Sequence, residues 1–185
     1  MFEREIVRHC SATLAGLKTG NSFIVPCTDR REMRDNVRRV NAALTASGIR
    51  VIIAKFFEKS ALIYLYRPDR LKEDLCDPEA CSILSGRGYP CGNAGRCVKR
   101  LLGRLKDYSE YPHEIGLFLG YPPGDVKRFI MDPHDGVKCC GCWKAYGNEK
   151  RVSALFDRMR RCRREYETAF AAGCPLKELA VASRS

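Results

Sequence analysis

Apolar and polar residues alternate with a helical period in the first quarter of the chain. Between Asp29 and about Ala46 an apolar residue recurs every three or four positions, which predicts an amphipathic helix. Asp29 is a favourable N-cap residue, and Gly48 is typical of the position that follows a helix. The residues on the predicted apolar face are Met33, Val37, Val40 and Leu44.

The strongest strand signal follows this helix. Residues 50–57 and 61–66 are rich in β-branched and aromatic side chains, and the short segment 58–60 separates them. Two such runs joined by a short turn predict an antiparallel hairpin. Residues 22–26 are a further short strand candidate, and Ser11 is predicted to cap a short helix that runs through Leu17.

The second half of the chain shows mainly helical periodicity, punctuated by prolines. Helices are predicted over about 69–75, 78–85, 94–107, 112–119, 123–131 and 148–171, with a short one after Pro175. Residues 137–146 fit either a strand or a knuckle. Strands early and helices late predict one α+β domain over residues 1–185: a small, mainly antiparallel sheet with helices packed on one face and a helix-rich C-terminal half.

Composition narrows the class of protein. The chain has 185 residues, 45% hydrophobic and 30% charged, which is typical of a globular protein with one core. No apolar run approaches the length of a membrane-spanning helix, and the N-terminus has no apolar signal segment. We therefore expect no membrane partner. Eleven cysteines without an export signal favour a reducing cytoplasm, where the thiols are buried, metal-bound or reactive.

Positive charge is concentrated near the C-terminus. The net charge is +11, and residues 138–164 hold nine Lys and Arg residues against two acids, a charge of +7. Such a field attracts an acidic or phosphate-bearing partner. The candidate phosphate- or nucleic-acid-binding side chains on the predicted helix 148–171 are Arg158, Arg160, Arg161 and Arg164. The alternative is a solvated amphipathic helix, and no nucleic-acid-binding motif accompanies the arginines.

The cysteines cluster most densely around residues 139–142. Cys139 and Cys142 form a C-x-x-C pair, whose sulfurs can grip one tetrahedral metal ion. The ligand set considered is His134, Cys139, Cys142 and Cys162, with zinc or iron as the metal. No second C-x-x-C completes the pattern, and the alternative is a set of small buried residues beside a tryptophan.

Two further segments combine reactive groups with a predicted helix start. Cys91 lies just before the helix that begins near Ala94, and Cys97 follows it, so the two are either a redox pair or part of a capped, packed turn. Residues 9–21 hold a His–Cys pair, hydroxyls and a lysine at a predicted helix N-terminus. That combination suits an anion or phosphate site, and the alternative is an N-terminal cap packed on the core.

Three stretches of the chain resemble a bacterial family of domains of unknown function. They read HCSATLAGLKTGN at residues 9–21, PHEIGLFLGYP at 112–122 followed by Asp125-Val126, and GCWKAY at 141–146. The resemblance extends over nearly the whole chain. Together with the chemistry of the side chains, it implies one basic, aromatic pocket. The candidate pocket residues are His9, Cys10, Thr13, Lys18, Asn21, His113, Tyr121, Trp143, Lys144 and Tyr146.

Four kinds of function remain open at this point. The cysteine density favours a metal- or redox-linked cytoplasmic protein. The basic helix fits a nucleic-acid or phosphate-ligand binder, whose affinity would fall steeply with salt. A pocket of His9, Cys10 and His113 fits an enzyme, and an interaction module without chemistry is the fourth alternative. No residue pattern identifies a substrate or a reaction, and zinc and iron are the cofactors to which the cysteines point.

Overall fold

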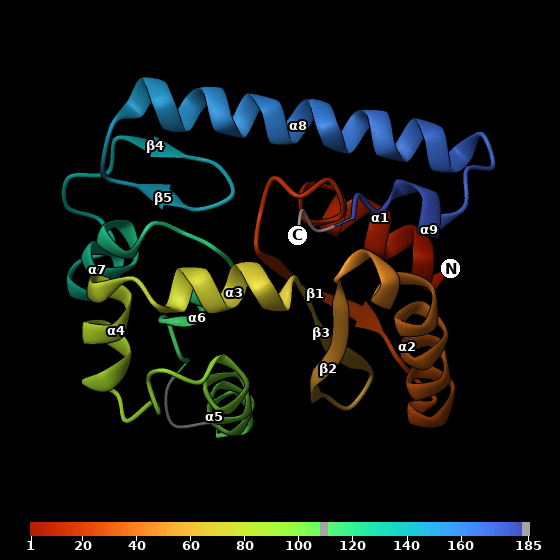
Figure 1. Cartoon of the computed structure of the whole chain (residues 1–185), viewed down its shortest axis with the longest axis horizontal. Coiled ribbons are helices and arrows are strands. Elements are labelled where there is room, and N and C mark those ends of the chain that lie inside the picture. The colour runs from red at the N-terminus through yellow and green to blue at the C-terminus, as the bar shows by residue number, and fades with distance from the viewer. Residues whose placement is uncertain (108–110, 183–185) are drawn as a thin grey trace. The chain divides into compact units, whose positions relative to one another are not determined.

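The computed structural model describes residues 1–107 and 111–182 and divides them into two compact units (Figure 1). The first unit comprises residues 1–70 and the described residues from 161 onward, and the second comprises residues 71–160. A three-stranded antiparallel sheet, a two-stranded hairpin and many helices confirm the predicted α+β class. The expectation of a single domain stays a prediction.

The first unit is built on a sheet of order β1-β3-β2, with β1 at Gly20–Pro26, β2 at Arg50–Phe56 and β3 at Ser60–Tyr66. β2 and β3 form the predicted hairpin, and β1 pairs antiparallel with the other side of β3. Alternate residues of the strands, such as Phe23, Val51 and Ile63, enter one hydrophobic core. One face of the sheet is therefore apolar and needs a cover of helices.

Three helices supply apolar residues to this core: α1 (Phe2–Leu14), α2 (Arg30–Leu44) and α9 (Leu176–Leu179). α1 contacts β1 and α2 contacts β2. The predicted apolar face of α2, which includes Val37 and Leu44, is buried. α9 brings the C-terminal part of the chain into the same core, so the first unit is made from both ends of the sequence.

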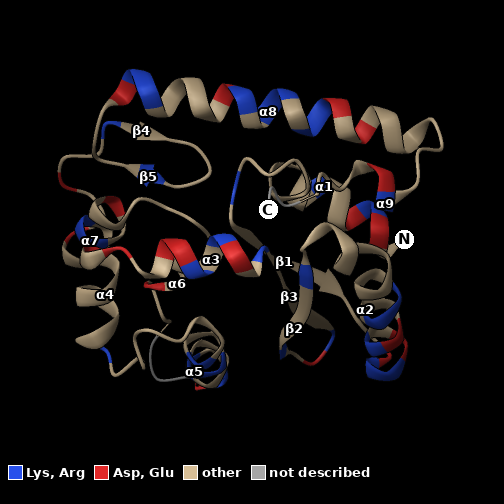
Figure 2. Cartoon of the chain, in the orientation of Figure 1, with Lys and Arg blue, Asp and Glu red and all other residues tan. Residues whose placement is uncertain are grey.

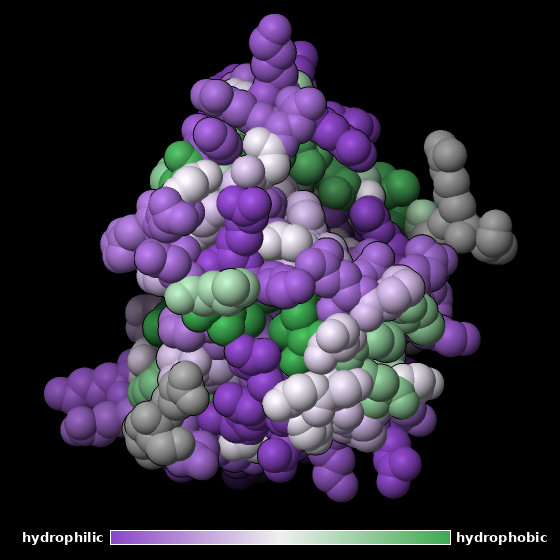
Figure 3. Space-filling model, turned by 90° about the vertical axis from the view of Figure 1, so that its left-hand side faces the viewer, coloured by the Kyte–Doolittle hydropathy of each residue, from purple (hydrophilic) through white to green (hydrophobic). Residues whose placement is uncertain are grey.

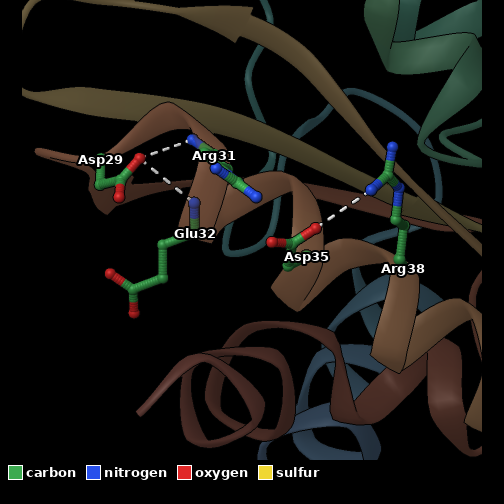
Figure 4. A network of polar contacts seen from close by, with 5 residues as sticks. All are labelled: Asp29, Arg31, Glu32, Asp35 and Arg38. Atoms are coloured by element: carbon green, nitrogen blue, oxygen red, sulfur yellow. Dashed lines mark hydrogen bonds and ion pairs between the residues drawn. The ribbon is translucent and has the colours of Figure 1, made fainter.

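The start and end of α2 follow the sequence signals. The Asp29 carboxylate accepts hydrogen bonds from the main-chain N–H groups of Arg31 at 2.7 Å and Glu32 at 3.3 Å (Figure 4). These N–H groups have no carbonyl acceptor within the helix, and the Asp29 carboxylate supplies one. After a 3₁₀ turn at Thr45–Ser47, Gly48 adopts the left-handed conformation with φ of 70° that ends the segment.

The predicted start of the first helix is wrong. α1 begins at Phe2, and Ser11 lies buried in its last turns rather than at its N-cap. Ile6, Cys10 and Leu14 are each fully buried, and their spacing of four residues gives α1 an apolar face that begins well before Ser11. Burial of that face outweighs the local preference of serine for a helix start.

The second unit is mainly helical. It contains α4 (Pro78–Ser85), α5 (Ala94–Lys106), α6 (Ile115–Phe118), α7 (Pro123–Met131) and the hairpin of β4 (Cys139–Cys140) and β5 (Lys144–Ala145). The chain passes between the units within α3 (Pro68–Leu75) and α8 (Glu149–Ala171). The hairpin resolves the alternative between strand and knuckle at residues 137–146, and α6 is shorter than the predicted helix 112–119 because it starts at Ile115.

A buried carboxylate connects three parts of the second unit. Glu114 is 1% exposed, and one of its oxygens accepts the Tyr89 hydroxyl at 2.7 Å. The guanidinium of Arg104, on α5, lies 3.1 Å from the same carboxylate, and that of Arg87 lies 3.6 Å from it. A buried charge is tolerated only where it is paired and hydrogen-bonded, so these partners hold the loop 86–93 and α5 against residue 114.

Candidate functional site

The clearest cavity in the described residues lies wholly within the second unit. It has a volume of about 450 Å³, within the usual range of small-molecule sites. Its walls are mostly apolar and aromatic and come from the segment before α6, from α7 and from the β4–β5 hairpin. The lining residues are Tyr111, His113, Ile115, Gly116, Tyr121, Asp125, Val126, Phe129, Cys140, Gly141, Trp143 and Lys144.

Trp143, the only tryptophan in the chain, forms the centre of one wall. Its ring stacks on Tyr121 with centroids 4.8 Å apart and meets Phe156 of α8 edge-on at 4.7 Å. The indole N–H donates to the Asp125 carboxylate at 2.9 Å. Contacts on its face, edge and polar atom together fix the orientation of the indole.

Asp125 is the polar link between α7 and the hairpin. One carboxylate oxygen accepts the Trp143 indole N–H, and the other accepts the main-chain N–H of Tyr146 at 2.9 Å. The Tyr121 hydroxyl adds a third connection, because it donates to the Cys142 carbonyl at 2.9 Å. The second and third motifs of the sequence therefore form one wall of the cavity. Burial raises the pKa of the Tyr121 hydroxyl, so it stays protonated and remains a donor.

Two glycines allow this wall to close. A methyl group at Gly116 would lie 2.8 Å from a methyl carbon of Val126 and 3.0 Å from the Tyr121 ring. Gly116 therefore lets α6 pack closely against α7 and Tyr121. At Gly141 the added carbon would lie 2.3 Å from the Phe156 ring. Gly141 has no positive φ, so it is not needed for an unusual backbone conformation; its role is to let the hairpin approach α8.

A cation and an imidazole are among the groups that line the cavity. The Lys144 ammonium donates to the Pro133 carbonyl at 2.9 Å and lies 5.8 Å from the centroid of the Phe129 ring. The His113 ring meets Tyr111 and Phe129 edge-on, with centroids 5.6 and 5.3 Å away.

On the face that holds α4, α7 and the hairpin, hydrophobic residues gather in patches between hydrophilic ones (Figure 3).

Four of the ten predicted pocket residues line this cavity: His113, Tyr121, Trp143 and Lys144. Tyr146 is also in the second unit, but it is buried behind the wall, and its hydroxyl has no hydrogen-bond partner among the described residues. The other five, His9, Cys10, Thr13, Lys18 and Asn21, belong to the first unit. That all ten share one pocket stays a prediction.

The motif at residues 9–21 surrounds the end of α1 and not its start. Arg67, 2% exposed, donates to the carbonyls of Thr13 and Leu14 at 2.7 and 2.8 Å, in the last turn of α1. It also donates to the carbonyls of Ser47 and Val181. A helix C-terminus carries partial negative charge, so this place suits a cation and disfavours the anion expected there.

The reactive-looking groups of this motif have packing partners. His9 stacks on Phe23 with centroids 5.1 Å apart and lies 3.4 Å from the Glu5 carboxylate, and partial burial lowers the pKa of its imidazole. Cys10 is fully buried, and burial raises the pKa of its thiol far above the usual range, so it stays protonated. Thr13 donates to the Asn21 side chain at 3.1 Å. Cys10 is therefore a poor nucleophile.

The predicted metal ligands are divided between the units. His134, Cys139 and Cys142 lie in the second unit and Cys162 in the first, where its thiol reaches the Ser11 carbonyl at 3.6 Å. Within residues 1–107 and 111–182, no group of three or more His, Cys, Asp and Glu side chains is arranged to hold a metal ion. The zinc or iron site stays a prediction.

Lys and Arg recur along α8 (Figure 2). The four predicted phosphate-binding arginines lie on this helix, and all of them are exposed. Arg160 pairs with Asp157 three residues before it. Neighbouring acids lower the positive potential along the helix, as expected for a solvated amphipathic surface. Phosphate or nucleic-acid binding by Arg158, Arg160, Arg161 and Arg164 stays a prediction.

The candidate pocket of the sequence analysis lacks the other eight lining residues, among them Tyr111, Asp125, Val126 and Phe129. Asp125 and Val126 stood inside the family motif but were not assigned to the pocket. Phe129 follows Asp125 by four residues and Val126 by three on α7, a spacing that places all three near one face of the helix. That spacing is the signal that would have found it.

An α+β protein with an aromatic, mainly apolar pocket is the class that the fold and the cavity define. The particular family is shown by comparison: residues 6–180 match the family described as "Protein of unknown function (DUF3793)", and the chain belongs to it. No curated protein and no solved structure matches the chain. None of the described helices is long and apolar enough to cross a membrane.

Proposed function

We propose that the protein binds a small molecule in the cavity of the second unit, and that this ligand is a flat ring system carrying an acidic group. The observation that supports this most is the enclosure of about 450 Å³ by aromatic side chains with one ammonium group at its wall. A pocket of this kind, largely apolar with a few fixed polar groups, is the usual form of a ligand site.

A flat ligand fits the shape of the walls. Trp143 is held in place on its face, edge and nitrogen. His113 and Phe129, which also line the cavity, meet edge-on. Rings fixed in this way offer broad surfaces without loss of side-chain freedom on binding, which favours stacking of another ring.

An acidic group on the ligand follows from Lys144. Its ammonium uses one of three protons on the Pro133 carbonyl, and the side chain lines the cavity. Asp125 also lines the cavity, but both of its oxygens already accept a hydrogen bond from the protein. The remaining donors of Lys144 would therefore pair with an anion.

Two naphthalene derivatives test this proposal. 2-Naphthoate and 2-naphthamide share one ring system and differ in charge, and we expect both to move the single indole N–H resonance of Trp143, with naphthoate bound more tightly. In Lys144→Met, naphthoate should bind about tenfold more weakly, while the affinity for naphthamide should not change. Titrations followed by nuclear magnetic resonance give both constants.

Lys138→Met is the matched control, because Lys138 is an exposed lysine next to the same hairpin and does not line the cavity. It should leave both affinities unchanged. Equal weakening by both lysine substitutions would show a general charge effect instead of a specific contact. An indole resonance that neither compound moves would contradict the proposed site itself.

A second proposed function is a redox-linked role in the cytoplasm through the cysteines. The observation that favours it is that all eleven cysteines are free, and that several in the second unit lie near one another. Free thiols persist in a reducing compartment. Metal analysis of protein purified without oxygen tests the metal-linked form: stoichiometric zinc or iron would support it, and metal-free protein would leave only the thiol form.

A further inference from the structure

Two cysteines of the second unit, distant by ten residues in sequence, lie against each other. Cys81 is on α4, and Cys91 is in the turn that precedes α5. The Cys91 sulfur is 3.4 Å from the Cys81 carbonyl oxygen. Burial raises the pKa of the Cys81 thiol, and the nearby Cys91 thiol adds to that rise. No spacing motif in the sequence relates them, so only the fold brings them together.

The surroundings of the pair keep its sulfurs in place and reachable. The Cys81 thiol donates to the Leu75 carbonyl at 3.1 Å, and the Cys91 sulfur lies 3.1 Å from the Ser85 hydroxyl. Cys91 is exposed and Cys81 is half-buried. A dissolved reagent therefore reaches Cys91 first and finds Cys81 beside it, which is the arrangement of an attacking and a resolving thiol.

We propose that Cys81 and Cys91 are a reversible modification site that a low-molecular-weight disulfide converts into an intramolecular disulfide. This inference rests on the proposed redox-linked role and names its site. It differs from the Cys91–Cys97 pair considered from the sequence, because Cys97 is 1% exposed and its thiol donates to the Pro90 carbonyl.

The chemistry is two successive thiol–disulfide exchanges. The Cys91 thiolate attacks one sulfur of glutathione disulfide, which forms a mixed disulfide and releases one glutathione thiolate. The Cys81 thiolate then attacks the Cys91 sulfur, forms the Cys81–Cys91 bond and releases the second glutathione. Both cysteines lose a proton and together lose two electrons, and one glutathione disulfide is reduced to two glutathione molecules.

The bond would close the loop that carries the partners of Glu114. Arg87 and Tyr89 lie between the two cysteines, and both contact the Glu114 carboxylate. Closing a loop reduces the freedom of its unfolded and partly open forms. Oxidation would then keep Arg87 and Tyr89 in contact with Glu114. Glu114 follows His113, which lines the cavity, so the disulfide would also steady this part of the cavity wall.

Peptide mapping tests the site. The intact protein is equilibrated with reduced and oxidised glutathione, its remaining thiols are alkylated, and it is digested with trypsin. Cleavage after Lys72, Arg87 and Arg96 places Cys81, Cys91 and Cys97 on separate peptides. We expect the peptides 73–87 and 88–96 to be joined, lighter together by two hydrogen atoms, and to separate again when glutathione is in the reduced form.

Matched serine variants assign the bond. Cys81→Ser should abolish the joined peptides and leave Cys91 as a mixed disulfide with glutathione. Cys76→Ser should still give the joined peptides, because Cys76 is exposed and shares peptide 73–87 without forming the proposed bond. Loss of the joined peptides in Cys76→Ser, or a link from Cys91 to the Cys97 peptide, would overturn the assignment.

The outcomes also separate this inference from the wider redox proposal. If other cysteines are oxidised while Cys81 and Cys91 remain alkylated, the pair is wrong and a redox-linked role survives elsewhere in the chain. If all eleven cysteines remain alkylated in excess glutathione disulfide, both the pair and the redox-linked role are contradicted.

Discussion

The two units use their buried charges differently. In the first unit the buried guanidinium of Arg67 donates to four main-chain carbonyls, and so serves the backbone at the end of α1. In the second unit the buried carboxylate of Asp125 accepts from Trp143 and Tyr146 and positions side chains beside a cavity. The motif of the first unit thus packs in its hydrophobic core, whereas the motifs of the second unit line the cavity.

Removing the guanidinium of Arg67 should give the largest effect. In Arg67→Met four carbonyls, two of them in buried contacts, lose a charged donor, and we expect the free energy of unfolding to fall by about 3–4 kcal/mol. Urea unfolding followed by circular dichroism measures the loss. Arg39→Met, at an exposed position on α2, should stay within about 0.5 kcal/mol of the parent. A small loss in Arg67→Met would remove the structural role assigned to the first motif.

A methyl group at Gly141 should affect the second unit. In Gly141→Ala the new carbon overlaps the Phe156 ring, and overpacking of this kind costs about 1–3 kcal/mol. Unfolding followed by Trp143 fluorescence measures this loss of stability, because Trp143 contacts Phe156 and is the only tryptophan in the sequence. Gly147→Ala is the control, since its added carbon meets no atom within 4 Å. Equal effects in both variants would contradict the close approach of hairpin and helix.

Loss of the α2 cap should give the smallest effect. Asp29→Ala leaves two N–H groups of the first turn without their acceptor, and we expect a loss of about 1 kcal/mol. Asp35→Ala, which breaks an exposed ion pair with Arg38, should cost less than about 0.5 kcal/mol (Figure 4). Thermal unfolding compares them. A greater loss in Asp35→Ala would mean that surface charge, not capping, stabilises the start of α2.

Local signals in the sequence predicted the parts of the fold that depend on local contacts. The cap at Asp29, the stop at Gly48 and the β2–β3 hairpin each depend on a few neighbouring residues, and each is confirmed. The start of α1 differs from the prediction because the apolar spacing before Ser11, and not the preference of Ser11 for a cap, sets the helix boundary. Burial in the core decided that boundary.

The candidate site was predicted only in part, for a related reason. The resemblance to the family selected His113, Tyr121, Trp143 and Lys144, and these line the cavity. Glu114 belongs to the same motif, but its structural role as a buried carboxylate depends on Arg87, Tyr89 and Arg104, which lie 10 to 27 positions away. Contacts between residues so far apart leave no periodic trace in one sequence, and the approach of Cys81 to Cys91 escaped notice in the same way.

Because the first unit is built from two separate stretches of the chain, it cannot complete its core until late in synthesis. Its core includes Leu176 and Leu179 of α9, and Arg67 donates to the carbonyl of Val181. These partners emerge from the ribosome only after the whole segment of the second unit. Until α9 has emerged, the apolar face of α1 and the sheet are exposed and must be kept from aggregating with other molecules, a task in which cellular chaperones commonly assist.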